Sequence, residues 1–257
     1  MLLESYKTFE PANYLQEYYS TVDLENRSLL AFFAEAYKGI DPNSVMLEFS
    51  GGPSLYSLIT AAAHVKEIHF SDFLERNVEE IKLWKRFRHR SYIWINFFKE
   101  ALMAEGLSEV STDDILEREE LLSKKLSDFL LCDAFNRHPL GQRCYQRYDV
   151  VAANFVAESI TPSLKTWEEV VNNICSTLKP SGTLIMTAIQ GASFYCVENH
   201  RYPAIAVTPE DVIRVLSYQG FDVDNLLMRH IPAEITDISA KDYKGYQGML
   251  FVKATRL

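Results

Sequence analysis

The alternation of short apolar runs with longer amphipathic stretches constrains the fold of this 257-residue chain more than any other feature. The apolar runs have the length of buried strands, and the stretches between them have the length of helices. Strands are predicted at 45–49, 67–71, 128–132, 149–154 and 183–188. This βαβ alternation is typical of an α/β fold with a mostly parallel sheet.

The C-terminal part of the chain continues the pattern. A helix is predicted at 167–178, followed by a turn at 179–182 that contains Pro180 and Gly182. Another helix is predicted at 209–219 and ends at Gly220. The last two strands, predicted at 221–230 and 249–255, would form an antiparallel pair.

Two segments stand outside this alternation. Residues 1–38 are rich in Tyr and Phe and are predicted to form a helical lid. The charged segment 78–125 is predicted as one or two surface helices, with residues 117–120 on a solvated helix face. Both segments are predicted to be additions to a single domain, 1–257, whose core spans 40–257.

Charge and composition argue against several functions. The chain has 35 Asp and Glu against 26 Lys and Arg, a formal net charge of −9, which argues against a nucleic-acid partner. No apolar run reaches the roughly 18 residues of a membrane span, and a secretory signal pattern is missing. The four cysteines have neither zinc-site nor disulfide-framework spacing. We therefore expect a cytoplasmic protein without a metal centre or a membrane partner.

The turn after the first predicted strand is the strongest local signal for a ligand. Ligands of open α/β sheets bind outside the carboxyl ends of the strands, where glycines let them approach the backbone. Here Gly51 and Gly52 follow the strand, but Ser50 stands where the first glycine of the usual acidic-x-Gly-x-Gly pattern would be. The pattern is therefore matched in part.

Two aspartates follow neighbouring strands. Asp72 lies about 20 residues after the glycine pair, where a carboxylate typically accepts from both ribose hydroxyls. Asp133 follows the third strand and is a candidate acceptor for an adenine amino group. The structural alternatives are a helix N-cap for Asp72 and an ordinary loop residue for Asp133.

Motifs for other chemistries are missing from the sequence. It contains no GxxxxGK[ST] phosphate loop, no GxSxG nucleophile turn and no HExxH metal motif. A nucleoside would thus be held by carboxylates and backbone without phosphate-binding machinery. An adenosyl ligand without phosphate, S-adenosylmethionine, fits this pattern better than NAD does.

Further motifs over nearly the whole chain resemble those of a known family. Its N-terminal Tyr-x-x-Phe-x-Pro-x-x-Tyr-Leu-x-x-x-Tyr motif is matched from Tyr6 to Tyr19. Other matching stretches are Gly52-Pro53-Ser54-Leu55-Tyr56, Asp72-Phe73-Leu74-Glu75-Arg76-Asn77, Cys132-Asp133, Pro139-Leu140-Gly141 and Leu178-Lys179-Pro180-Ser181-Gly182. The chain therefore resembles the small-molecule methyltransferases that include the nicotinamide, phenylethanolamine, indolethylamine and thioether enzymes.

This resemblance implies a fold, a cofactor and a set of cofactor-binding residues. The fold would be a class I methyltransferase fold, Rossmann-like, with seven mostly parallel strands and helices on both faces. The cofactor would be S-adenosylmethionine, the product S-adenosylhomocysteine, and the enzyme a monomer. The implied cofactor-binding residues are Tyr14, Tyr19, Ser50, Gly51, Gly52, Tyr56, Asp72, Phe73, Asn77, Asp133, Ala134, Asn154 and Phe155.

The resemblance also implies which residues meet the methyl acceptor, a small molecule. Tyr6 and Tyr18 would face it from the lid, and Tyr195 is a further candidate. Asp242 and Tyr246 lie in the final hairpin region, which closes the substrate pocket in the family. Glu158 matches an acidic residue that faces the amine in the phenylethanolamine enzyme, and the alternative is an exposed Glu near a helix start. Because an ammonium cannot attack a methyl group, Glu158 would bind it and take its proton, directly or through water.

We therefore expect transfer of a methyl group to a nitrogen of a small polar amine or guanidine-like metabolite. Two alternatives stay open at this point. S- or Se-methylation of a small thioether or thiol would need no base, and a catalytically silent S-adenosylmethionine-binding protein would need no substrate lid. An NAD(P) oxidoreductase is disfavoured because GxGxxG is missing.

Overall fold

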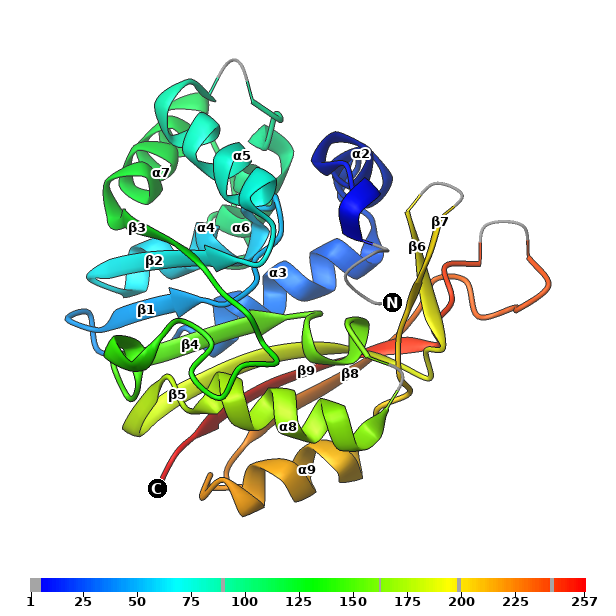
Figure 1. Cartoon of the computed structure of the whole chain (residues 1–257). Coiled ribbons are helices and arrows are strands. Elements are labelled where there is room, and N and C mark those ends of the chain that lie inside the picture. Colours follow the sequence, from blue (N-terminus) through cyan, green and yellow to red (C-terminus); the bar gives the residue numbers. More distant parts are fainter. Residues whose placement is uncertain (1–5, 89–90, 162, 198–199, 241–242) are drawn as a thin grey trace.

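A central β-sheet is built from the short apolar runs of the sequence. The computed structural model describes residues 6–88, 91–161, 163–197, 200–240 and 243–257. The main sheet contains β1 (Val45–Glu48), β2 (Glu67–Asp72), β3 (Leu126–Leu131), β4 (Tyr148–Asn154), β5 (Leu178–Gln190), β8 (Leu227–Pro232) and β9 (Gly248–Thr255). The strand order is β3-β2-β1-β4-β5-β9-β8, with β9 antiparallel to both neighbours and the other pairs parallel (Figure 1). The predicted seven-stranded, mostly parallel sheet is confirmed.

Helices pack on both faces of this sheet, as predicted. Among the described residues, seven helices form these layers: α3 (Leu24–Ala36), α4 (Tyr56–His64), α5 (Glu75–Arg86), α6 (Ile95–Ala104), α7 (Thr112–Lys125), α8 (Leu164–Cys175) and α9 (Pro209–Tyr218). A further helix, α2 (Pro11–Tyr19), lies outside these layers. Side chains of α3, α4 and α6 share one hydrophobic core with Met46, and those of α8 and α9 share a second core with Leu47. Because successive strand residues point to opposite faces, β1 contributes to both cores. Figure 1 shows these two helix groups on opposite sides of the sheet.

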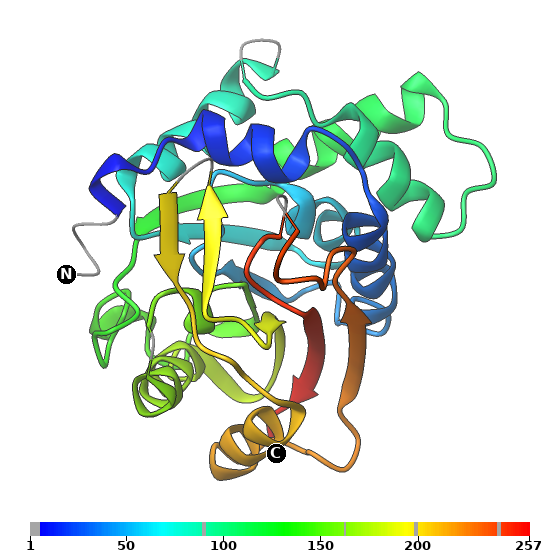
Figure 2. The ribbon, with the colours of Figure 1, turned by 90° about the vertical axis from the view of Figure 1, so that its right-hand side faces the viewer.

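Three parts of the chain cover the edge of the sheet where the parallel strands end (Figure 2). They are η1 (Tyr6–Thr8) with α2, the hairpin of β6 (Phe194–Val197) and β7 (His200–Pro203), and the loop segments 233–240 and 243–247. The hydroxyl of Tyr18 in α2 donates to the carbonyl of Cys196 in β6 at 2.6 Å. The hydroxyl of Tyr6 donates at 2.9 Å to the carbonyl of Ser159, in η4 (Ala157–Ser159) after β4. These contacts join the lid to the core.

The helical lid is shorter than the predicted segment 1–38. Leu29, Leu30 and Phe33 of α3 are buried against the sheet, so this helix belongs to the core layer. Asp23 begins α3 by accepting from the backbone N–H of Asn26 at 2.8 Å. The described part of the lid therefore consists of η1 and α2.

The predicted boundaries around α8 are shifted. The helix begins earlier than predicted because the side chain of Ser163 caps it by accepting from the backbone N–H of Thr166. The helix also ends earlier than predicted, at Cys175, and β5 begins at Leu178. The turn predicted at 179–182 therefore falls inside the span of β5. The positive φ of Ser181, 59°, and a register shift between β4 and β5 mark this turn as an irregularity in the strand.

The strand predicted at 221–230 begins later, at Leu227. The carboxylate of Asp222 accepts from the backbone N–H of Asn225 at 3.2 Å and holds the intervening segment as a turn. Phe221 makes an isolated bridge to Arg256 instead of starting β8. The antiparallel pairing of the last two strands, β8 and β9, is confirmed. A further short 3₁₀ helix, η3 (Gln142–Cys144), precedes β4.

The charged segment 78–125 differs most from its prediction. It contains parts of three helices, α5, α6 and α7, and α6 lies in the core through Phe97 and Phe98. The predicted solvated face of α7 is wrong for Arg118, because α7 packs against α4. The Arg118 guanidinium donates to both Glu105 carboxylate oxygens, at 2.7 and 2.6 Å, and to the Ile59 carbonyl. This segment is thus partly internal.

Arg118→Ala should lower the free energy of unfolding by about 3 kcal/mol, because it leaves the largely buried Glu105 carboxylate without its partner. Lys124→Ala on the same helix is the control, since Lys124 is 71% exposed and pairs at the surface. Urea denaturation of both variants gives the two values. Equal, small losses in the two variants would contradict a structural role for Arg118.

Candidate active site

The turn between β1 and α4 keeps a glycine-like backbone although Ser50 replaces the first glycine. Ser50 has a φ of 52° and Gly52 a φ of 63°, both in the left-handed region. A non-glycine residue there costs roughly 1–2 kcal/mol. A Cβ at Gly51 would lie 2.5 Å from the ring of Phe70 and 2.8 Å from Cγ of Glu48. Position 51 therefore requires glycine for space, and Ser50 carries the strain of the turn.

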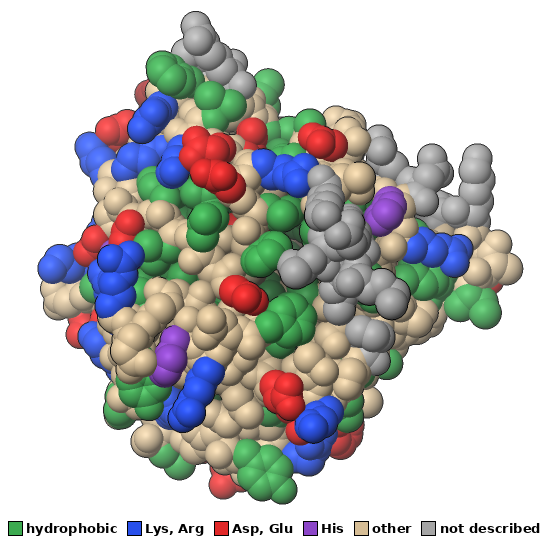
Figure 3. All heavy atoms as spheres, in the orientation of Figure 1, with side chains coloured by type: hydrophobic (Ala, Val, Ile, Leu, Met, Phe, Trp, Pro, Cys, Tyr) green, Lys and Arg blue, Asp and Glu red, His purple; other side chains and the backbone are tan. Residues whose placement is uncertain are grey.

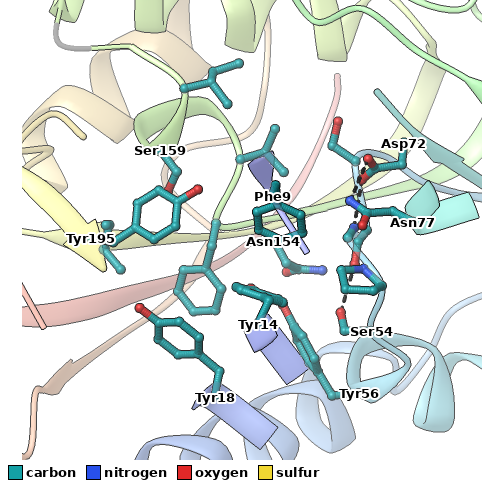
Figure 4. A pocket seen from close by; sticks show the side chains of 18 of the residues that line it. Phe9, Tyr14, Tyr18, Ser54, Tyr56, Asp72, Asn77, Asn154, Ser159 and Tyr195 are labelled. Carbon is teal, nitrogen blue, oxygen red and sulfur yellow. Dashed lines mark hydrogen bonds between the residues drawn. The ribbon is translucent and has the colours of Figure 1, made fainter. Parts of the chain in front are cut away.

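The carboxylate of Asp72, at the end of β2, connects three parts of the site (Figure 4). Its Oδ2 accepts from the backbone N–H of Gly52 at 2.9 Å, and its Oδ1 accepts from that of Leu74 at 2.8 Å and from Nδ2 of Asn77 at 2.9 Å. Burial raises the pKa of Asp72, although these hydrogen bonds oppose the shift. Leu74, not Asp72, is the N-cap residue of α5, so the N-cap alternative is not what the structure shows.

Tyrosines form the wall that faces this turn. The rings of Tyr19 in α2 and Tyr56 in α4 stack with centroids 5.2 Å apart, and the hydroxyls of Tyr14 and Tyr19 are 3.4 Å apart. Burial raises the pKa of all three hydroxyls. These phenols are therefore neutral hydrogen-bonding groups at physiological pH.

A cavity of about 200 Å³ lies between the turn, the strand ends and the lid. Every cofactor-binding residue predicted from the sequence lines it, and so do Tyr6, Tyr18 and Tyr195. These residues come from the lid, from the ends of β1, β2 and β4, from the loop after β3, from α4 and α5, and from β6. Figure 4 shows Tyr14, Asn154 and Tyr195 around this space. The structure thus brings together residues that are up to 189 positions apart in the sequence.

Glu158, the predicted acid, is fully buried but is not among the residues that line this cavity. Its Oε1 accepts from the backbone N–H of Ile189 at 3.0 Å and from Oγ of Ser159 at 3.4 Å, and its Oε2 has no partner among the described residues. Burial raises the pKa of Glu158 to about 7. Ser159 does line the cavity, and its hydroxyl connects the cavity wall to the Glu158 carboxylate behind it. Asp242 lies outside the described residues.

A second buried carboxyl group lies under the cavity. Oε1 of Glu48 accepts from Oγ of Ser57 at 2.8 Å and from Nδ2 of Asn154 at 3.2 Å. Burial raises the pKa of Glu48 to about 8. The group is therefore largely protonated at neutral pH, and it accepts hydrogen bonds from Ser57 and Asn154 without a full negative charge.

Sequence reasoning missed several residues that line the cavity, among them Asp23, Glu25, Ser159 and Lys244. Asp23 and Glu25 carry the ordinary signature of a helix N-terminus, which gives no hint of a cavity. Lys244 lies in an irregular loop with no periodicity. Tyr246, which the resemblance places near the final hairpin, also lines the cavity and donates to Glu25.

Comparison with known proteins identifies the family. The family model described as the NNMT/PNMT/TEMT family matches residues 2–257. The chain belongs to this family. Phenylethanolamine N-methyltransferase of Mus musculus is 27% identical over 254 residues, covering 94% of this chain and 83% of that protein. Indolethylamine N-methyltransferase of Oryctolagus cuniculus is 29% identical over 231 residues, covering 87% and 86%.

Membership confirms the predicted enzyme class, an S-adenosylmethionine-dependent N-methyltransferase of small molecules. Solved structures agree in fold. The DhpI–SAH complex matches with a TM-score of 0.55 and 13% identity, covering 98% of this chain and 96% of that chain. The YcgJ protein of Bacillus subtilis matches with a TM-score of 0.54 and 7% identity, covering 88% and 97%. The predicted class I methyltransferase fold is thereby confirmed.

The cavity fits S-adenosylmethionine. Gly51 and Gly52 offer a backbone cradle, and buried Oδ1 of Asn77, beside Asp72, has no partner among the described residues and is free to accept from the ligand. Neutral tyrosine hydroxyls stand at the other end. Within the described residues no helix is long and apolar enough to cross a membrane, and no group of three or more His, Cys, Asp or Glu could hold a metal ion.

Gly51→Ala should destabilise the protein by roughly 3 kcal/mol and weaken binding of S-adenosylmethionine, because the added Cβ displaces the ring of Phe70. Gly39→Ala is the matched control: Gly39 has a φ of 79° but open space around it, so its cost should be about 1 kcal/mol of backbone strain alone. Thermal unfolding with and without the cofactor measures both. Equal costs would show that space at Gly51 is not limiting.

Glu48→Gln should flatten the pH dependence of stability between about pH 4.5 and 8. Since burial raises the pKa of Glu48 from 4.5 to about 8, the stability that depends on its proton is complete below pH 4.5 and falls until pH 8. The variant cannot lose that proton, so part of the fall should disappear. Urea unfolding across this range tests it, with the exposed Glu17→Gln as control. Parallel profiles for Glu48→Gln and the wild type would contradict the buried acid.

Proposed function

We propose that this enzyme transfers the methyl group of S-adenosylmethionine to a nitrogen of a small polar amine or guanidine-like metabolite. The observation that carries this proposal is a single cavity in which the predicted cofactor residues meet tyrosines of the lid. The methionine end of the cofactor would be held by Tyr14, Tyr19 and Tyr56, and the ribose region by Asp72, Phe73 and Asn77. The adenine would be bound by Asp133 and Ala134. The wall near the sulfonium would be formed by Asn154 and Phe155. The bound cofactor supplies an electrophilic methyl group.

Positioning accounts for most of the catalysis in such a displacement. The lid excludes water and aligns the two reactants, which is worth several kcal/mol in well-oriented reactions. The aromatic faces of Tyr6 and Phe155 stabilise a cationic amine and the methylated cation that forms. The relatives named above act on phenylethanolamine and indolethylamine, and we carry over from them an amine as acceptor.

The proton of the amine needs a route out of the cavity, because the attacking nitrogen must have a free lone pair. We propose that Glu158 takes this proton through Ser159, whose hydroxyl joins the cavity wall to the Glu158 carboxylate. The pKa of Glu158, about 7, suits a base that works near neutral pH. The direct contact between Glu158 and the amine expected from the sequence is not needed in this arrangement.

Glu158→Gln and Ser159→Ala should each lower kcat about 10- to 100-fold at pH 7, with the Kd for S-adenosylmethionine unchanged. The exposed Glu169→Gln is the control. Radiolabelled methyl transfer to a panel of small amines gives kcat, and isothermal titration gives the Kd. Full turnover in Glu158→Gln would remove Glu158 from the mechanism.

The pH dependence of turnover separates this proposal from methylation of a thioether or thiol, which needs no base. Since the Glu158 carboxyl accepts a proton only when ionised, kcat for an amine should rise with pH around 7 and level off above it. The rise should vanish in Glu158→Gln. A flat profile in the wild-type enzyme, measured from pH 5.5 to 9, would favour the sulfur acceptor instead.

We also propose that 1–257 works as one methyltransferase domain, as a cytoplasmic monomer that binds no nucleic acid. The four free cysteines support a reducing compartment. On the face shown in Figure 3, Lys and Arg side chains are interspersed with Asp and Glu, which supports a small-molecule rather than a nucleic-acid partner.

A further inference from the structure

Lys244 brings a positive charge into the wall of the cavity. Among the described residues that line the cavity it is the only Lys or Arg. Its Nζ lies 5.2 Å from the centroid of the Tyr18 ring, and its side chain is half-buried. The ion pairs formed within the described part of the chain do not include it. The Tyr18 ring thus offers partial compensation for a charge that lacks a described anionic partner.

The backbone that carries Lys244 is held firmly. The next residue, Gly245, has a φ of 103°, and a Cβ there would lie 2.2 Å from the carbonyl oxygen of Phe194 in β6. The backbone N–H of Ser193 donates to the carbonyl of Gly245 at 3.4 Å. Tyr246 is buried beyond it. Lys244 is therefore a half-buried cation in the cavity wall, on a backbone that lies against β6.

Two carboxylates that line the same cavity as Lys244 already have partners in the fold. Glu25 accepts from the Tyr246 hydroxyl at 2.7 Å and from the backbone N–H of Glu234 at 2.9 Å. Asp23 caps α3 by accepting from the backbone N–H of Asn26. Both lie at the N-terminus of α3, where the helix dipole stabilises negative charge. Glu25 and Asp23 thus have structural roles in the fold, whereas no such role is seen for Lys244 among the described residues.

We infer that the methyl acceptor is an amine that also carries an anionic oxygen group, a carboxylate or a phosphate, which Lys244 binds. This inference rests on the proposed function, because it assigns the second end of the same acceptor. An ammonium and an anionic oxygen form a strong, charge-assisted hydrogen bond when water is partly excluded. The nitrogen of the acceptor would then face Ser159, which lies in η4. The anionic group of the acceptor would face Lys244, which lies in the loop segment 243–247.

Three acceptors that differ in one group test this inference: 2-phenylethylamines with a para methyl, carboxylate or phosphate. The wild-type enzyme should have a kcat/KM for one anionic acceptor that is about 10- to 100-fold higher than for the methyl compound. The difference should come from a lower KM, with kcat nearly unchanged. The preferred member tells carboxylate from phosphate. Lys244→Gln should abolish the preference and change the rate with the methyl compound by less than about threefold. Lys244→Arg should keep the preference.

Arg201→Gln is the matched control, because Arg201 lies over the Phe194 ring of the same hairpin, 4.4 Å from its centroid, but does not line the cavity. A wild-type preference for the methyl compound, or an equal loss with all three acceptors in Lys244→Gln, would overturn the inference and leave the proposed function standing. Calorimetric binding with S-adenosylhomocysteine present measures the anion preference independently of turnover. Failure to methylate any of the three acceptors, or any amine of the panel, would contradict the proposed function.

Discussion

The hydrogen bonds of the Asp72 carboxylate are the interaction on which the rest of the site depends. One oxygen holds the backbone of Gly52 in the first turn, and the other holds the start of α5 through Leu74 and Asn77. The end of β2 thereby fixes the distance between the first turn and the start of α5. A carboxylate suits this task because it accepts several hydrogen bonds at once. Its Oδ2 keeps acceptor capacity beyond the bond from Gly52, which supports the proposed role of Asp72 in binding the ribose.

The cofactor half of the site could be predicted from the sequence because it is built at the ends of regular elements. Strand ends, a glycine turn and a helix with a tyrosine stripe have local signatures, and the residues in those signatures all reach the cavity. Ser50 shows the limit of such matching. It departs from the family pattern in chemistry but keeps the left-handed backbone, with a φ of 52°, that the glycine would adopt. The conformation is set by the packing around Gly51.

The acceptor half was harder to predict because it comes from irregular segments. Glu25 has the sequence signature of a helix start, and Lys244 lies in a loop whose position depends on the contact between Gly245 and Phe194. Glu158 illustrates the opposite problem. Its position along the chain matches a family acid, but the three-residue 3₁₀ helix η4 directs its carboxylate to the backbone of Ile189. The spacing of residues along the sequence does not show whether a side chain points into the cavity or lies behind its wall.

The charges around the cavity favour movement of positive charge from sulfur to nitrogen. Glu48, beneath the floor, is largely protonated at neutral pH because burial raises its pKa to about 8, and the surrounding tyrosines stay neutral. Neutral groups around a bound cofactor would not hold its positive charge tightly at one place. Charged carboxylates near the sulfonium would stabilise the reactant more than the transition state, in which that charge is already leaving. In the proposed mechanism, neutral groups near the sulfonium avoid this extra stabilisation of the reactant. Glu158, which is hydrogen-bonded to Ser159 behind the cavity wall, would still accept the proton of the amine.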